Sequence, residues 1–199
     1  VYSQQGLEDL ACMRSLPTML VLQPADDVET AHMVEHLAHD PRPAYMRLTR
    51  QDLPRVHDDS YRFAPGKYAT LVDGNDVAIL ATGGTVGAAV EASLALEKEG
   101  VRARVLNASS VKPVDDDAIE TCAKECKHGL VTVEDHNVLG GLGGAVAESL
   151  TSRTPAKLLR LGVKDEFGES GDPKALYAKH GLDADGIAKA VRALVHAGR

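Results

Sequence analysis

Residues 131–148 limit the possible folds of this chain more than any other part of its sequence. The segment begins with β-branched valines that suit a buried strand, and it continues with four glycines between Gly140 and Gly144 that permit a tight turn. Small apolar residues from Ala145 onward suit a helix that packs closely on a sheet. A strand, a tight turn and a helix in direct succession form the repeating unit of an α/β domain.

Strands and helices alternate on both sides of this unit. After a polar segment at 53–65, we expect strands at 67–72, 77–81, 103–106, 130–134 and 157–161 and helices at 85–99, 115–127, 142–151, 173–179 and 183–197. The turn residues 73–76 predict that the first two strands form an antiparallel hairpin. The pattern therefore predicts a three-layer α/β/α domain whose five-stranded sheet is mostly parallel, with one antiparallel strand.

A shorter α/β piece precedes the polar segment. Helices are predicted at 7–16 and 26–39, and strands at 19–22 and 44–48. This piece lacks the beginning of a complete domain, so we interpret the chain as the C-terminal portion of something longer. Because such a piece would expose apolar surface, we expect residues 1–52 to be rearranged, partly disordered or paired with another copy.

Composition argues against several classes of function. The net charge is −7 and no cluster of lysines or arginines offsets it, which argues against a nucleic-acid-binding surface. The longest apolar runs have the length of strands, so no membrane-spanning segment is predicted. Three cysteines are an odd count that does not suggest a disulfide framework. We expect a cytoplasmic protein with no nucleic-acid or membrane partner.

Two glycine turns could each bind an anion at the N-terminus of a helix. The turn at 140–144 departs from the dinucleotide-binding pattern, because Val146 stands where that pattern needs a third glycine, and no P-loop lysine follows it. Close packing against a helix or a subunit is the favoured explanation for this turn. The second turn, at 83–85, is explained by helix capping through Thr85.

Two pairs of potential metal ligands stand four residues apart on predicted helices. His32 and His36 match the H-x-x-E-H pattern of some zinc peptidases, but no third ligand is evident. Cys122 and Cys126 lack the second pair that a zinc site would need. We therefore predict a solvated helix face for the histidines, two buried small side chains for the cysteines, and no metal site.

Polar side chains mark the ends of two predicted strands. His136 stands between Asp135 and Asn137 at the carboxyl end of a parallel strand, where α/β sheets place functional groups. No nucleophile accompanies His136, so a structural hydrogen-bonding role is favoured. Arg50 follows the strand at 44–48, and its planar guanidinium suits a phosphate or carboxylate, with a surface ion pair as the alternative.

Seven segments, in the same order along the chain, resemble the C-terminal portion of a transketolase. They are residues 3–11, 14–17, 23–26, 48–54, 107–115, 134–144 and 164–171. The last three look especially like the split transketolases, in which the enzyme consists of two chains. The resemblance extends over nearly the whole sequence.

This resemblance implies a thiamine-diphosphate enzyme that transfers a two-carbon ketol unit between sugar phosphates. Residues 1–58 would be the C-terminal remnant of the pyrimidine-binding domain plus a linker, and residues 59–199 the transketolase C-terminal domain, which would support a homodimer. The N-terminal part of the same enzyme would be the partner that carries the Mg²⁺ ligands and the catalytic glutamate. We therefore expect this chain alone to be inactive, with no catalytic residue and no bound cofactor or metal.

Two substrate-binding residues carry over from the family. Arg50 matches the arginine that binds the substrate phosphate. Gln4 stands where many members have a substrate-contacting histidine, and it can exchange hydrogen bonds with a sugar hydroxyl but cannot titrate. The alternatives are a related enzyme, such as 1-deoxyxylulose-5-phosphate synthase or a two-oxoacid dehydrogenase β subunit, or a regulatory module that binds an anion at 83–85 or 140–144.

Overall fold

The structure is a computed structural model that describes residues 6–197. Along the chain, the elements are α1 (Asp9–Ser15), β1 (Leu20–Leu22), α2 (Asp27–His39), β2 (Ala44–Met46), β3 (Ala69–Val72), β4 (Val77–Ala81), the 3₁₀ turn η2 (Gly83–Thr85), α3 (Val86–Glu97), β5 (Ala103–Asn107), β6 (Ser110–Lys112), α4 (Asp116–Glu125), β7 (Leu130–Asn137), α5 (Leu142–Ser152), β8 (Leu158–Val163), α6 (Pro173–His180) and α7 (Ala184–His196). Within these residues, every predicted helix and strand is present, with bounds that shift by a few residues. None of these helices is both long enough and apolar enough to cross a membrane.

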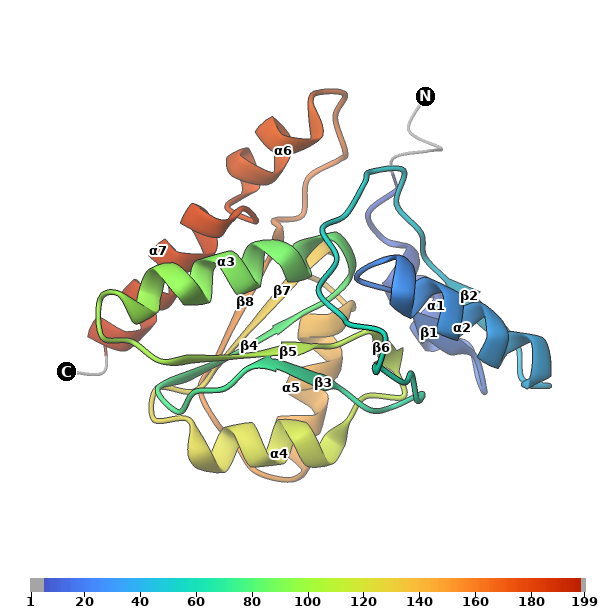
Figure 1. The fold of residues 1–199 in the computed structure, drawn as a ribbon, viewed down its shortest axis with the longest axis horizontal. Helices are drawn as coiled ribbons and strands as arrows, with labels where there is room; N and C mark the ends of the chain where they lie inside the picture. The colour runs from blue at the N-terminus through green and yellow to red at the C-terminus, as the bar shows by residue number, and fades with distance from the viewer. Residues whose placement is uncertain (1–5, 198–199) are drawn as a thin grey trace.

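The elements form two sheets that lie side by side (Figure 1). The larger sheet has the order β3-β5-β4-β7-β8, with α3 and α7 on one face and α4 and α5 on the other. The smaller sheet has the order β2-β1-β6. We call residues 6–52 the smaller unit and residues 66–197 the larger unit.

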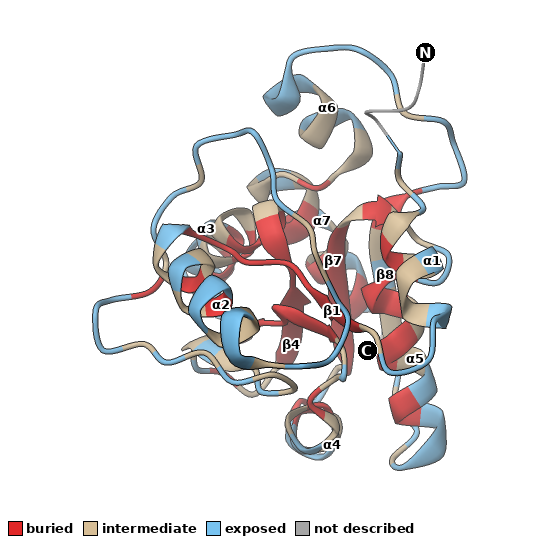
Figure 2. Cartoon of the chain, turned by 90° about the vertical axis from the view of Figure 1, so that its right-hand side faces the viewer, coloured by how far each residue is buried: buried red, intermediate tan, exposed pale blue. Residues whose placement is uncertain are grey.

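Strand β4 lies at the centre of the larger unit, and its five residues are fully buried. Because successive side chains of a strand point to opposite faces, Ile79 packs with α3 and α7 whereas Leu80 packs with α4 and α5. Figure 2 shows β4 and β7 as buried ribbons enclosed by helices. A continuous apolar strand of this kind is typical of a parallel sheet that is covered on both faces.

The pairing of strands confirms the predicted fold class and corrects one detail. Strands β5, β4, β7 and β8 are mutually parallel, and β3 runs antiparallel to β5. The predicted hairpin of β3 with β4 is wrong, because β5 lies between them. The turn at 73–76 crosses the beginning of β5 instead: Asp76 exchanges backbone and side-chain hydrogen bonds with the Arg102 backbone, and a Cβ on Gly74 would lie 2.5 Å from the Arg102 carbonyl oxygen.

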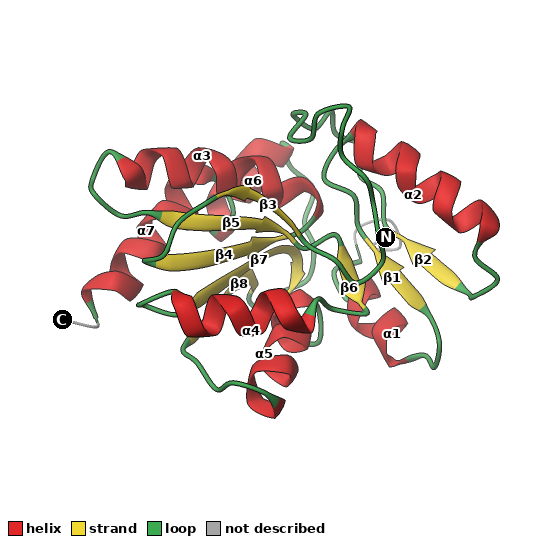
Figure 3. Ribbon diagram, turned by 60° about the horizontal axis from the view of Figure 1, so that its bottom comes forward, coloured by secondary structure: helices red, strands yellow, loops and turns green. Residues whose placement is uncertain are grey.

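The smaller sheet is completed by a strand from the larger unit that the sequence pattern did not predict. β6 follows β5 directly and pairs antiparallel with β1, next to the parallel pair of β1 and β2 (Figure 3). Val111 of β6 packs with Leu10 and Val21 in a small apolar cluster. Residues 6–52 thus keep the predicted α-β-α-β order against β6, so the structure contradicts the first of the three expected alternatives, rearrangement, for these residues.

The polar segment at 53–65 is tied to α2 by a buried carboxylate. Asp26 caps α2 by accepting from the Glu29 amide, and it also accepts from the backbone amides of Val56 and His57 and lies 3.0 Å from the His57 ring nitrogen Nδ1. Burial alone would raise the pKa of Asp26, but these backbone hydrogen bonds outweigh it and lower that pKa. The predicted linker is therefore fixed to the smaller unit.

A second buried carboxylate joins the same segment to the larger unit. Glu29 is fully buried and accepts hydrogen bonds from the Asn107 side-chain amide at the end of β5 (2.8 Å) and from the Tyr61 hydroxyl (2.5 Å). The Asn107 amide also lies 3.2 Å from His57 Nε2. Buried polar groups need such partners, so this network fixes how the two units meet.

Candidate functional site

A cleft of about 490 Å³ opens where the two units meet. Its walls come from Gln23 after β1, residues 47–51 after β2, Asp135 in β7, residues 168–173, and Tyr177 and His180 of α6. Gln23, residues 47–51 and Asp135 lie at the carboxyl ends of parallel strands, where α/β sheets bind their ligands. The cleft is therefore the candidate functional site.

In the larger sheet, the crevice outside the ends of β4 and β7 is filled by side chains of the protein itself. Gly83 adopts a φ of +57°, and a Cβ at this position would overlap the Gln23 side-chain amide. A Cβ on Gly84 would lie 2.6 Å from the Tyr177 hydroxyl. The turn at 83–85 therefore allows Gln23, which follows β1, and Tyr177 of α6 to pack closely on it.

Thr85 is the N-cap residue of α3, as predicted, but its side chain does not cap the helix. Its hydroxyl donates to the carbonyl oxygens of Thr82 (2.8 Å) and Val133 (3.0 Å), and no side-chain capping bond is present. The side chain connects η2 to β7 instead, since a hydroxyl at this buried position needs a carbonyl partner.

Gly83→Ala should destabilise the protein by about 2 kcal/mol, because the alanine would need a positive φ and would also displace Gln23. Gly100→Ala is the matched control: Gly100 has a φ of +81°, but nothing lies within 4 Å of its Cβ position. We expect a loss of about 1 kcal/mol there. Urea denaturation of both variants measures the difference, and equal losses would contradict the packing role of Gly83.

Asp135 is the centre of the hydrogen-bond network in the cleft. Its Oδ1 accepts from Arg47 Nη1 at 2.5 Å and from the Gln23 side-chain amide at 2.9 Å. Its Oδ2 accepts from the Tyr177 hydroxyl at 2.8 Å. Burial raises the pKa of Tyr177, and the Asp135 charge and hydrogen bond raise it further. One carboxylate thereby joins β1, β2, β7 and α6.

Arg47 lies between two carboxylates. Its Nε is 3.0 Å from Asp9 Oδ2 and its Nη1 bonds Asp135, and its side chain is 17% exposed. The Tyr45 hydroxyl donates to the same Asp9 oxygen, and burial together with Asp9 raises the pKa of Tyr45 to about 12. Burial would lower the pKa of Arg47, but Asp135 and Asp9 outweigh it and raise that pKa. Arg47 is thus a fully paired structural cation.

Arg50 differs from Arg47 in that it is exposed and unpaired. It lies in the wall of the cleft, and within residues 6–197 no hydrogen bond or ion pair holds its guanidinium. Each of the other arginines in this part of the chain has at least one such partner. The surface ion pair considered as an alternative for Arg50 is therefore not formed there. Gln4, the other predicted site residue, lies outside the described residues.

His136 is fully buried and has the predicted structural role. Its Nε2 accepts from the Ala11 amide at 3.3 Å, and its Nδ1 lies 2.6 Å from the Asn137 carbonyl oxygen, so that the ring ties α1 to β7. Burial lowers the pKa of His136. A neutral ring with a proton on Nδ1 satisfies both contacts.

The glycine turn at 140–144 already holds an anion from the protein itself. The buried carboxylate of Glu134 accepts from the amides of Leu142 (2.7 Å) and Gly143 (2.8 Å) at the beginning of α5. A Cβ on Gly141 would overlap this carboxylate. Burial raises the pKa of Glu134 to about 7, although both backbone bonds oppose the shift. The Leu142 and Gly143 amides are therefore already used by the protein's own carboxyl group, as the packing role predicts.

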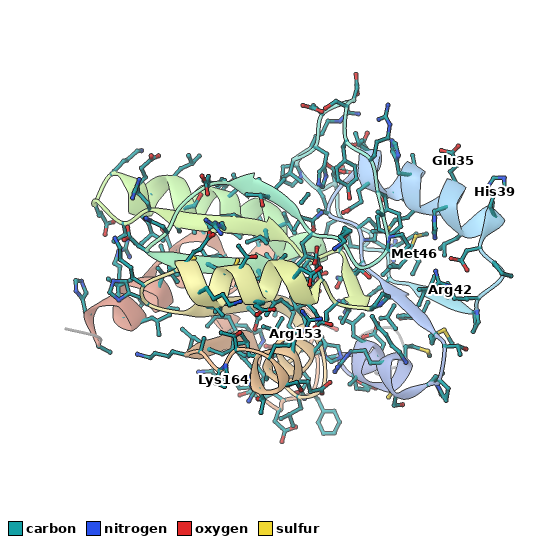
Figure 4. The ribbon with its side chains drawn as sticks, turned by 90° about the horizontal axis from the view of Figure 1, so that it is seen from below. Glu35, His39, Arg42, Met46, Arg153 and Lys164 are labelled. Atoms are coloured by element: carbon teal, nitrogen blue, oxygen red, sulfur yellow. The ribbon has the colours of Figure 1, made fainter. Side chains whose placement is uncertain are left out.

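The other candidate ligand pairs hold no metal site. Among residues 6–197, no group of three His, Cys, Asp or Glu side chains is placed to bind a metal ion. His32 and His36 are half-buried with their rings edge-on to Tyr61 and Phe63, so the predicted solvated face is only partly correct. Glu35 and His39 of the same helix point outward (Figure 4). The two predicted buried cysteines, Cys122 and Cys126, are 1% and 6% exposed.

Comparisons with known proteins agree with this architecture. Residues 1–56 match the family model of the transketolase pyrimidine binding domain, and residues 66–187 match that of the transketolase C-terminal domain. One of the subunits of an apulose-4-phosphate transketolase of Phocaeicola vulgatus is 40% identical over 188 residues, which are 94% of this chain and 60% of that protein. A 1-deoxy-D-xylulose-5-phosphate synthase of Syntrophus aciditrophicus is 36% identical over 201 residues, 99% of this chain and 31% of that protein.

A solved structure is also similar over almost the whole chain. It is described as a split gene transketolase in the form of an inactive beta4 tetramer, and it is 42% identical with a TM-score of 0.93. The match covers 98% of this chain and 63% of that one. The sequence thus spans about 60% of the shorter relatives that it matches and about a third of the longer ones.

Proposed function

Since the chain belongs to the transketolase family, we propose that it forms the sugar-phosphate-binding wall of an enzyme that transfers a two-carbon ketol unit between sugar phosphates. The enzyme would work in the cytoplasm as a dimer. The N-terminal part of the same enzyme would be the partner of this chain, and the chain alone would be inactive.

The free guanidinium of Arg50 carries this proposal. A planar, bidentate donor suits a phosphate, and Arg50 lines a cleft of about 490 Å³, a volume suited to a small organic ligand. The paired Arg47 nearby cannot supply this donor, because Asp9 and Asp135 already neutralise it. Gln4 stands two residues before Gly6, which lines the same cleft, and it is our second candidate for contact with the sugar.

Thiamine diphosphate, the cofactor of this family, would supply the carbanion chemistry in the complete enzyme. The residues described here do not fit its Mg²⁺–diphosphate site, because no group of metal ligands is placed for it within 6–197. We assign the metal ligands and the catalytic glutamate to the N-terminal part. The role of this chain is then to bind and orient the phosphorylated sugar.

Reconstitution tests the proposal. This chain is combined with the N-terminal part of the enzyme, thiamine diphosphate and Mg²⁺, and supplied with xylulose 5-phosphate as donor and ribose 5-phosphate as acceptor. We expect ketol transfer only when both protein parts are present. Turnover of pyruvate, without turnover of xylulose 5-phosphate, would contradict the proposal and favour an enzyme of the 1-deoxyxylulose-5-phosphate synthase type.

A further inference from the structure

We propose that Asp135 and Tyr177, both from the larger unit, are positioning residues for Arg50. They hold the segment 47–51 against the cleft so that the Arg50 guanidinium faces a bound phosphate. This inference rests on the proposed function of Arg50, and it assigns to the larger unit a part in substrate binding beyond support of a dimer.

The segment that carries Arg50 has few bonds of its own. Residues 48–52 are all exposed, and the only hydrogen bond found within this stretch joins the Gln51 amide to the Thr49 hydroxyl at 3.2 Å. A loop of this kind takes its position from the residues at its two ends. Both ends are fixed on other parts of the protein.

The N-terminal end is fixed through Arg47. Its backbone amide donates to the Leu22 carbonyl oxygen at 2.9 Å, and its guanidinium reaches both the carboxylate of Asp135 (2.5 Å) and the Asp135 carbonyl oxygen (3.2 Å). A planar guanidinium held at several points leaves little rotational freedom for the chain that follows. Arg50 stands three residues further on.

The C-terminal end packs on α3 and the turn before it. The Pro54 ring lies so close to Gly87 that a Cβ there would be 2.5 Å from Pro54 Cγ, and Leu53 lies against Gly84. Both ends of the exposed stretch are thus anchored on the larger unit. The position of residues 48–52 therefore depends on the crevice outside the ends of β4 and β7, which Asp135 and Tyr177 also occupy.

Asp135 is better suited to positioning than to contact with a substrate. Its carboxylate already accepts hydrogen bonds from Arg47, Gln23 and Tyr177, and its side chain is 18% exposed. The Tyr177 hydroxyl donates to Oδ2 and so fixes the rotation of the carboxylate toward Arg47. With Arg47 neutralised in this way, Arg50 remains as the unpaired cation of the cleft wall.

The primary test uses Tyr177→Phe in the complete enzyme, because this variant removes only a hydroxyl group and leaves every charge in place. Steady-state rates are measured with ribose 5-phosphate and with ribose as acceptors. We expect the KM for ribose 5-phosphate to rise about fivefold, with kcat nearly unchanged and no change for ribose. Asp135→Asn should show the same pattern with a rise of about 20-fold.

The control and the coupling test separate positioning from a general loss of structure. Asp117→Asn removes an exposed carboxylate that bonds Arg153, away from the cleft, and should change neither constant. In an Arg50→Ala background, Tyr177→Phe should have no further effect on ribose 5-phosphate. Equal losses with both acceptors, or effects of Tyr177→Phe and Arg50→Ala that multiply, would overturn the inference.

Hydrogen exchange gives a readout that does not depend on activity. The Arg47 amide, which donates to the Leu22 carbonyl oxygen, should exchange about tenfold faster in Asp135→Asn and in Tyr177→Phe, whereas the amides of β4 should not change. Unchanged exchange at the Arg47 amide in both variants would refute the positioning role. If Arg50→Ala alone leaves the preference for ribose 5-phosphate over ribose intact, the proposed function fails, and the exchange experiment still decides whether the loop is held as described.

Discussion

Replacing Arg50 with alanine should lower kcat/KM for ribose 5-phosphate by about 100-fold in the complete enzyme, which corresponds to about 2.7 kcal/mol of lost transition-state stabilisation. The reason is that a free guanidinium can bind a phosphate through two parallel charge-assisted hydrogen bonds. The kcat/KM for ribose, which lacks the phosphate, should be unchanged. Parallel steady-state measurements with both acceptors give the result.

Two further substitutions define the cause of that loss. Arg50→Lys keeps the charge but loses the planar fork, so it should recover only part of the rate. Arg55→Ala is the matched control, since Arg55 is also exposed but is paired with Asp27 of α2 at 2.5 Å. An Arg50→Ala variant that loses activity equally with ribose and ribose 5-phosphate would show that Arg50 does not act on the phosphate.

The second large effect concerns Glu134 and the dependence of stability on pH. Burial raises the pKa of Glu134 to about 7 in the folded protein, from an ordinary value of 4.5. The folded state therefore binds this proton more tightly than the unfolded state does. The resulting stabilisation is fully present below pH 4.5 and is lost as the pH rises through 7, by roughly 3 kcal/mol in total.

Glu134→Gln should remove most of this dependence, because a glutamine cannot ionise. Urea denaturation at several pH values between 4.5 and 8 measures the free energy of unfolding of both proteins. Glu91→Gln, at an exposed position of α3, provides a control that should retain the wild-type slope. If the free energies of Glu134→Gln and the wild type fall in parallel over this range, Glu134 is not the titrating group.

The order and type of the elements could be predicted because they depend on local patterns. The apolar runs of β4 and β7 and the glycines beside them identify strands and turns without knowledge of their neighbours. The hairpin prediction failed because the residues at 73–76 suit a tight turn between adjacent strands, whereas β5 lies between β3 and β4 in the sheet. Strand β5 begins only at Ala103, so no pattern near the turn reveals it. Strand β6 was missed because it has three residues and its partner β1 lies about 90 positions earlier.

The candidate site was only partly predictable for the same reason. The position of Arg50 at the end of a strand indicated an anion-binding group, and the structure places it in the cleft. Asp135 and His136 are neighbours, so the alternation of side chains along β7 sends one to the cleft and buries the other, and the sequence could not show which. The contacts of Asp135 with Arg47 and Tyr177 span 88 and 42 positions, beyond the reach of any local pattern.

The pairing of β6 with β1 has a consequence for anyone who recombines this protein with its relatives. A junction placed in the 53–65 segment looks natural, yet it would lay the β6 of one parent along the β1 of another. The register of Val21 with Lys112 and of Leu22 with Ser110 would then have to match between parents. A polypeptide cut at that segment would leave one edge of β1 bare and open to pairing with other chains. Chimeras should therefore exchange residues 110–112 together with the smaller unit.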